Sequence, residues 1–76
     1  MNITVIAFAH ARDTLGFASR TVPADPSDTP RSILLRLAPN ADLRALAVAV
    51  DSEYAPLDNP IGQAQELAVI PPVSGG

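Results

Sequence analysis

The chain has 76 residues, 47% of them hydrophobic and 4% aromatic, and its net charge is −3. This length suits a single domain, near the lower limit at which a hydrophobic core outweighs chain entropy, and we expect no second domain. The absence of cysteine excludes disulfide frameworks, thiol nucleophiles and cysteine-based zinc sites.

All five cations are arginines, and they are scattered along the chain rather than clustered. This distribution argues against nucleic-acid binding, and the acidic balance favours a basic protein partner. The apolar runs, such as ALAVAV at 45–50, are too short to span a bilayer, and no basic segment followed by a long apolar stretch opens the chain. We therefore expect a cytoplasmic protein without membrane contact.

The first elements are a predicted hairpin. Residues 2–9 alternate and are rich in β-branched side chains, which predicts a strand. One face of this strand carries Ile3, Val5 and Ala7. Residues 10–16 are typical of a turn or a single helical turn that ends at Gly16, the residue here best suited to a positive φ. Residues 17–23 alternate again, so they complete the hairpin.

A helix follows. Residues 24–30 are rich in helix breakers, and they end in a helix start. Thr29 or Asp28 is the predicted N-cap, with Pro30 at the first helical position. Residues 31–38 form the body of this short helix. Its apolar stripe is Ile33, Leu34 and Leu37.

The second half of the chain predicts three more strands. Residues 46–50 form a strand that the polar residues 51–53 end. Residues 54–57 are a brief return strand, and residues 58–65 are turn material. Residues 66–72 form the last strand.

The order of strand, strand, helix, strand, short strand and strand predicts a mixed sheet crossed by one main helix. The first and last strands are the most strand-like, and we expect them side by side in the middle. This is the β-grasp or ubiquitin-like arrangement, of the α+β class. A ferredoxin-like alternative needs a second helix, for which only NADLR at 40–44 is available. We expect a β-grasp domain over 1–72 and a flexible tail over 73–76.

No intrinsic active site is expected. His10 is the one histidine, no His-x-x-x-His pair occurs, and neither a metal site nor a glycine-rich phosphate loop can be assigned. The carboxylates of Asp51, Glu53 and Asp58 look like scattered turn residues. The chain therefore does not resemble an enzyme by itself, and no bound cofactor is expected.

The end of the sequence, PPVSGG, has a distinct physical character. Pro71 and Pro72 each fix φ and lack an amide proton, so they end the sheet ladder and start an extended segment. Gly75 and Gly76 have no Cβ, so they can pass through a channel too narrow for other residues. A frayed end is the alternative, although chance pairs of terminal glycines are rare.

These residues resemble a known family. FAHARDTLG at 8–16, AVAVDSEYAPLDNPI at 47–61 and AVIPPVSGG at 68–76 are similar to the MoaD type, the small sulfur-carrying subunit of molybdopterin synthase. The resemblance covers the whole chain, and the tail motif is its most specific part. Departures are Asp51 in place of the family's Asn, Val69 and Ile70 in place of an aromatic pair, and QAQE at 63–66 in place of a Gly-Asp turn.

The resemblance implies a mechanism and two partners. A ubiquitin-activating-like adenylyltransferase uses ATP to adenylate the carboxylate of Gly76, which then becomes a thiocarboxylate. The tail enters the large synthase subunit, where sulfur passes to cyclic pyranopterin monophosphate. A heterotetramer of two small and two large subunits is also implied.

The resemblance further assigns site residues. Gly76 carries the sulfur, and Gly75 gives the tail clearance. The partner-binding residues are Phe8, Arg12, Tyr54, Ile70, Pro71, Pro72, Val73 and Ser74. For Phe8 core packing is an equal alternative, and for Arg12 so is an ion pair with Asp13.

Three other functions compete with this reading. A sulfur carrier for thiazole synthesis shares the fold and the Gly-Gly end, but it typically lacks the preceding Pro-Pro-Val-Ser. A ubiquitin-like protein modifier would be joined to lysines of its targets. An adaptor domain with an inert tail is the simplest alternative.

Overall fold

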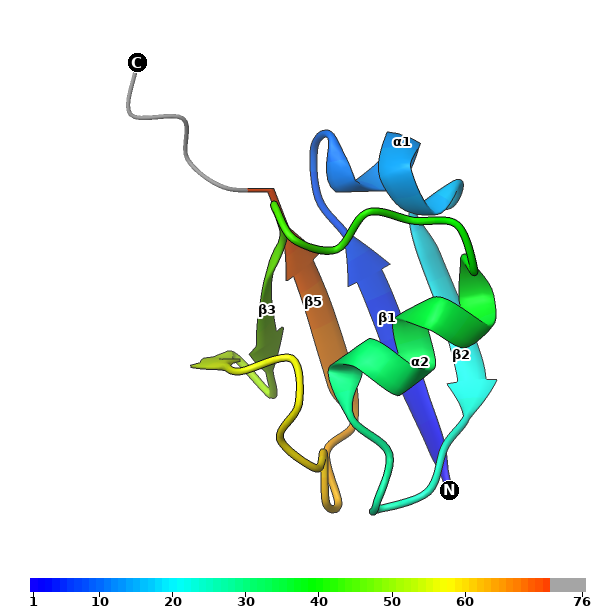
Figure 1. Ribbon diagram of the computed structural model, residues 1–76. Helices are drawn as coiled ribbons and strands as arrows, with labels where there is room; N and C mark the ends of the chain where they lie inside the picture. Colours follow the sequence, from blue (N-terminus) through cyan, green and yellow to red (C-terminus); the bar gives the residue numbers. More distant parts are fainter. Residues whose placement is uncertain (72–76) are drawn as a thin grey trace.

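The computed structural model describes residues 1–71 and contains a five-stranded mixed sheet with two helices (Figure 1). The elements in chain order are β1 (Asn2–Ala7), α1 (Ala11–Leu15), β2 (Ser19–Pro23), α2 (Pro30–Leu37), β3 (Ala47–Val50), β4 (Glu53–Ala55) and β5 (Glu66–Ile70). The predicted tail, 73–76, lies outside the described residues. Within residues 1–71, neither helix is long and apolar enough to cross a membrane.

The strand order is β2-β1-β5-β3-β4, so the first and last strands do lie side by side in the middle. β1 pairs parallel with β5 and antiparallel with β2, and β3 pairs antiparallel with both β5 and β4. The two central strands thus end at the same edge of the sheet (Figure 1). The predicted β-grasp arrangement is confirmed.

The core lies between one face of the sheet and α2. Residues at alternate positions of the central strands are fully or almost fully buried on this face: Ile3, Val5, Ala7, Leu67 and Val69. From α2, Ile33 and Leu34 join the same apolar cluster, while Leu37 packs against its edge. Figure 1 shows α2 crossing this one face of the sheet. The opposite face carries no helix among the described residues.

Local hydrogen bonds explain where α2 begins. The Thr29 hydroxyl oxygen accepts from the Ser32 amide at 3.1 Å, and the Ser32 hydroxyl oxygen accepts from the Thr29 amide at 2.9 Å. This reciprocal capping satisfies amides that have no partner within the helix. Thr29 is therefore the N-cap, and Pro30 occupies the first turn as predicted.

The second helix, α1, is the single helical turn that the sequence allowed between the first two strands. It ends at Gly16, whose φ is 85° and whose amide donates to the Arg12 carbonyl at 2.8 Å. The ferredoxin-like alternative is wrong, because residues 39–44 contain turns and no helix.

Lowering the pH is expected to destabilise the fold through Asp28. Its carboxylate accepts from Arg36 Nη1 at 2.8 Å, the Asp25 amide at 2.9 Å and the Ser32 hydroxyl at 3.0 Å. The Arg36 guanidinium, and then the Asp25 amide, hold the pKa of Asp28 well below its ordinary value. A depressed pKa contributes stability that is present above the unfolded pKa of about 4 and is lost as the pH falls below it.

The measurement is urea unfolding at about pH 6 and about pH 3. The wild type should lose on the order of 1 kcal/mol more unfolding free energy than Asp28→Asn over this interval. Equal losses in the two proteins would contradict this role of Asp28.

Candidate functional site

The face of the sheet that α2 leaves uncovered, called here the open face, carries an apolar row across four strands. Strand pairing aligns Ile6 with Ala68, Ala68 with Ala49 and Ala49 with Tyr54. Ala49 and Ala68 are buried, yet they lie outside the core cluster, since alternation turns them away from it. Because alanine side chains are short, the surface of the row is recessed at Ala68 and Ala49, between Ile6 and Tyr54.

A second row lies at the edge of the sheet where β1 and β5 end. Ile70 pairs with Ala47, and the Phe8 amide extends the ladder beyond β1 by donating to the Val69 carbonyl at 3.0 Å. Alternation from the buried Ala7 puts Phe8 on the open face. Its side chain is 49% exposed, so the surface interpretation of Phe8 holds over core packing.

Tyr54 and Ile70 also lie on this face. Tyr54, on the edge strand β4, is 76% exposed, and Ile70 is half-buried. Three predicted contact residues, Phe8, Tyr54 and Ile70, thus share one uncovered surface. An uncovered sheet face with large exposed apolar side chains is a typical protein-docking surface.

The chain leaves the sheet beside this surface. β5 ends at Ile70, and Pro71 follows as half-buried irregular chain. Since Pro71 has no amide proton, it cannot donate to the ladder, which explains why the last strand stops short of the predicted residue 72. The remaining predicted site residues, Pro72, Val73, Ser74, Gly75 and Gly76, lie outside the described residues.

Arg12 lies near this end, on α1. The proposed ion pair with Asp13 is not found among residues 1–71; instead Arg12 Nε donates to the Ala9 carbonyl at 3.5 Å. Ala9 itself has a φ of 49°. The left-handed backbone conformation of Ala9 turns the chain directly after Phe8. Arg12, in the helix that follows, is exposed.

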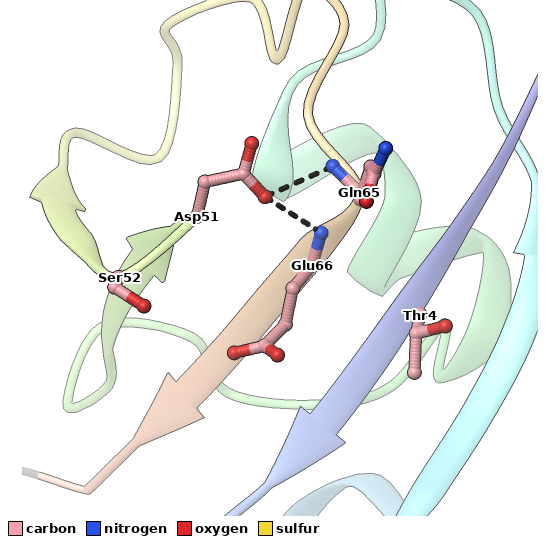
Figure 2. A pocket seen from close by; sticks show the side chains of 5 residues that line it. All are labelled: Thr4, Asp51, Ser52, Gln65 and Glu66. Carbon is pink, nitrogen blue, oxygen red and sulfur yellow. Dashed lines mark hydrogen bonds between the residues drawn. The ribbon is translucent and has the colours of Figure 1, made fainter.

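A feature that the sequence reasoning missed is the role of Asp51. Its Oδ1 accepts from the Gln65 amide at 2.9 Å and from the Glu66 amide at 3.0 Å, and so it fixes the start of β5 (Figure 2). Asp51 and Ser52 have φ values of 47° and 71° and form a two-residue hairpin loop. Asp directly after a strand was a signal for this loop, but its bond to a segment 14 residues away was not visible in the sequence.

Two replacements of Asp51 are expected to distinguish the contribution of its hydrogen bonds to stability from that of its charge. Asp51→Ala removes the acceptor for two amides and puts alanine in a left-handed conformation, so it should cost about 1–3 kcal/mol of unfolding free energy. Asp51→Asn keeps a side-chain oxygen and tolerates positive φ, so its cost should stay below about 0.5 kcal/mol. Chemical denaturation measures both; equal losses would contradict the assignment.

Among residues 1–71 no polar or charged residue is buried, and no group of three potential metal ligands is found. The pKa shifts arise in surface hydrogen bonds and ion pairs: Arg44 lowers the pKa of Asp42 to about 2, and Arg31 lowers that of Asp58. This body can dock and present its end to a partner.

Comparison with known proteins agrees with this architecture. The model of the ThiS family matches residues 5–76. A curated relative, the molybdopterin synthase sulfur carrier subunit of Mycosarcoma maydis, is 33% identical over 87 aligned positions, which cover 99% of this chain and 94% of the relative.

Solved structures share the fold over the whole length. The small archaeal modifier protein 1 of Haloferax volcanii has a TM-score of 0.74 at 25% identity and is matched over 100% of both chains. A Pyrococcus furiosus protein assigned as subunit 1 of molybdopterin converting factor has a TM-score of 0.71 at 17% identity, over 96% of this chain and 99% of that one. With a family model and a curated relative that both span nearly all of it, the chain belongs to the ThiS/MoaD family of ubiquitin-like β-grasp proteins.

Proposed function

We propose that this chain is the sulfur carrier subunit of a molybdopterin synthase and that Gly76 is its carrier residue. The observation that carries the proposal is the exit of the chain: the central strand β5 ends at Ile70, beside the exposed Phe8, and the motif Pro-Pro-Val-Ser-Gly-Gly follows. Family membership supports a carrier role, and the name of the Mycosarcoma maydis relative supports the synthase.

The chemistry begins at the carboxylate of Gly76. A carboxylate is a poor electrophile, so one of its oxygens first attacks the α-phosphorus of ATP, and pyrophosphate leaves. Sulfur at the oxidation level of sulfide, as hydrosulfide, then attacks the carbonyl carbon of the acyl-adenylate and displaces AMP, and loss of the S–H proton leaves a thiocarboxylate. In the proposal this sulfur is passed to cyclic pyranopterin monophosphate. ATP belongs to the activating enzyme, and the chain itself binds no cofactor.

The proposal divides the work between the chain and its partners. A ubiquitin-activating-like adenylyltransferase and the large synthase subunit supply the acids, bases and lysines, and the chain, which has no lysine, supplies the carrier. Two large subunits form a heterotetramer with two copies of this chain. The proposed location of the reaction is the cytoplasm.

Each predicted contact residue has a physical task in this scheme. Phe8, Tyr54 and Ile70 dock on the partner through the open face, with Arg12 at its margin. Pro71 and Pro72 stiffen the start of the segment, and Val73 and Ser74 continue it. Gly75 gives clearance in a narrow channel, because it has no Cβ.

Two alternatives have support of their own. A sulfur carrier for thiazole synthesis is favoured by the match to the ThiS family model. A protein modifier is favoured by the similarity to small archaeal modifier protein 1 over the full length of both chains. Both would also act through Gly76, so the acceptor of the activated end distinguishes them.

The test is a reconstitution with purified components. The thiocarboxylated chain is mixed with the large synthase subunit and cyclic pyranopterin monophosphate, and in parallel with a thiazole synthase and its substrates. Formation of the dithiolene product only in the first mixture supports the proposal. Sulfur transfer only in the second mixture, or an isopeptide bond to lysines of other proteins without any sulfur transfer, would replace it by the corresponding alternative.

A further inference from the structure

The composition of the open face changes along the strands, because its acidic side chains lie at one end of the sheet. Thr4 pairs with Glu66 in a third row, at the end of β5 opposite to Ile70. Beside this row, Asp51 bonds to the Gln65 and Glu66 amides. The row is polar and acidic, whereas the two rows closer to the exit of the chain are apolar.

Within residues 1–71 these two carboxylates form no ion pair. The ion pairs found among residues 1–71 join Arg31 to Asp58, Arg36 to Asp28 and Arg44 to Asp42. Neither Asp51 nor Glu66 takes part in them. Among the described residues, moreover, Asp51 uses only Oδ1 for its bonds, so its Oδ2 has no hydrogen-bond partner there.

The two acids line a hollow in the surface. Thr4, Ser52 and Gln65 complete its wall, and Figure 2 shows all five side chains around the start of β5. Carboxylates, hydroxyls and an amide oxygen all accept hydrogen bonds. The two amide bonds fix the Asp51 carboxylate in place before any partner arrives.

We infer that the open face docks the large synthase subunit in a fixed direction, with a cationic side chain of that subunit bound in the hollow between Asp51 and Glu66. The inference rests on the proposed function and adds to it the direction in which the open face docks. Ile70 lies four residues beyond Glu66 on β5, which places the cation about 13 Å from the point where the chain leaves the sheet.

Charge complementarity supports this partner chemistry. The chain is acidic overall, with a net charge of −3, and the acidic end of the open face, at the start of β5, lies at the end of the sheet opposite to α1 (Figure 1). An apolar surface alone permits docking in either direction along the strands. Only one direction brings the end of the chain to the large subunit's active site, and opposite charges at one end select it, mainly through the association rate.

The experiment compares two charge reversals on neighbouring parts of the sheet. Glu66 lies on the open face, whereas Glu53 pairs with Val50 and so lies on the opposite face. Glu66→Lys and Glu53→Lys change the net charge equally, so Glu53→Lys is the matched control. Glu66→Gln and Asp51→Asn remove single charges without steric change. Association rates with the large subunit are measured by surface plasmon resonance at low and high salt, after thermal melts of each variant.

Glu66→Lys is expected to slow association about tenfold at low salt, and Glu53→Lys less than about twofold, with the difference shrinking at high salt. Glu66→Gln and Asp51→Asn should each slow it about threefold. If Glu66→Lys and Glu53→Lys associate at equal rates while Phe8→Ala still weakens binding, the proposed direction of docking is overturned but the proposed function is not. Failure of the wild type to bind the large subunit would overturn both.

Discussion

Deletion of Gly76 is expected to abolish sulfur transfer to cyclic pyranopterin monophosphate, with a loss of at least about 100-fold that leaves the fold intact. The reason is chemical: in the proposed mechanism the carboxylate of this residue is the atom group that is adenylated and carries sulfur. Without it the carboxylate of Gly75 ends one residue too early, about 3.5 Å short of the position that the partner's active site requires. The measurement is product formation in the reconstituted synthase.

Glu53→Gln is the control, because Glu53 is exposed, lies on the face of the sheet opposite to the open face and is none of the predicted contact residues. It should keep activity within about threefold of the wild type, and both variants should melt at the wild-type temperature, since all five strands lie in residues 1–71 and Glu53 is exposed. Wild-type activity in the deletion variant would show that sulfur is carried elsewhere.

Leu67→Ala is expected to remove most of the stability of the fold. Leu67 is fully buried on β5, between β1 and β3, and its replacement leaves a cavity in the core. Such a change typically costs about 2–5 kcal/mol. A chain of this size has only about 4–11 kcal/mol of unfolding free energy in total, so a large share of it would be lost.

Ile70→Ala is the variant to compare with Leu67→Ala. Ile70 lies on the same strand but on the open face, where it is half-buried. Its truncation should cost about 1 kcal/mol of stability or less, while it weakens binding to the large subunit about tenfold or more. Urea unfolding and equilibrium binding measure the two effects. If Leu67→Ala melted like the wild type, or if Ile70→Ala bound like it, the assignment of the two faces would be wrong.

The fold was predictable because its signals are local and agree with one another. Alternation in residues 2–9 and 66–72, the breakers before Pro30 and the glycine at position 16 each correspond to an observed element or bond. The pairing of the first and last strands was expected because they are the two most strand-like runs of the chain.

Other features depend on contacts between distant parts of the chain and could not be predicted. The bond from Asp51 to the start of β5 joins segments that only the folded sheet brings together. The left-handed turn at Ala9, directly after the exposed Phe8, is another such feature, because alanine gives no signal for a positive φ. The burial of Ala49 and Ala68 outside the core cluster likewise depends on their neighbours across the sheet.

The central claim is that Gly76 carries sulfur, and intact-mass measurement tests it most directly. The full chain is incubated with its activating enzyme, ATP and a sulfur donor, and is then weighed alone and after fragmentation. The account predicts a gain of about 16 Da, the difference of sulfur for oxygen, located on Gly76. An unchanged mass in the presence of an active adenylyltransferase, or the same gain located on any other residue, would contradict it.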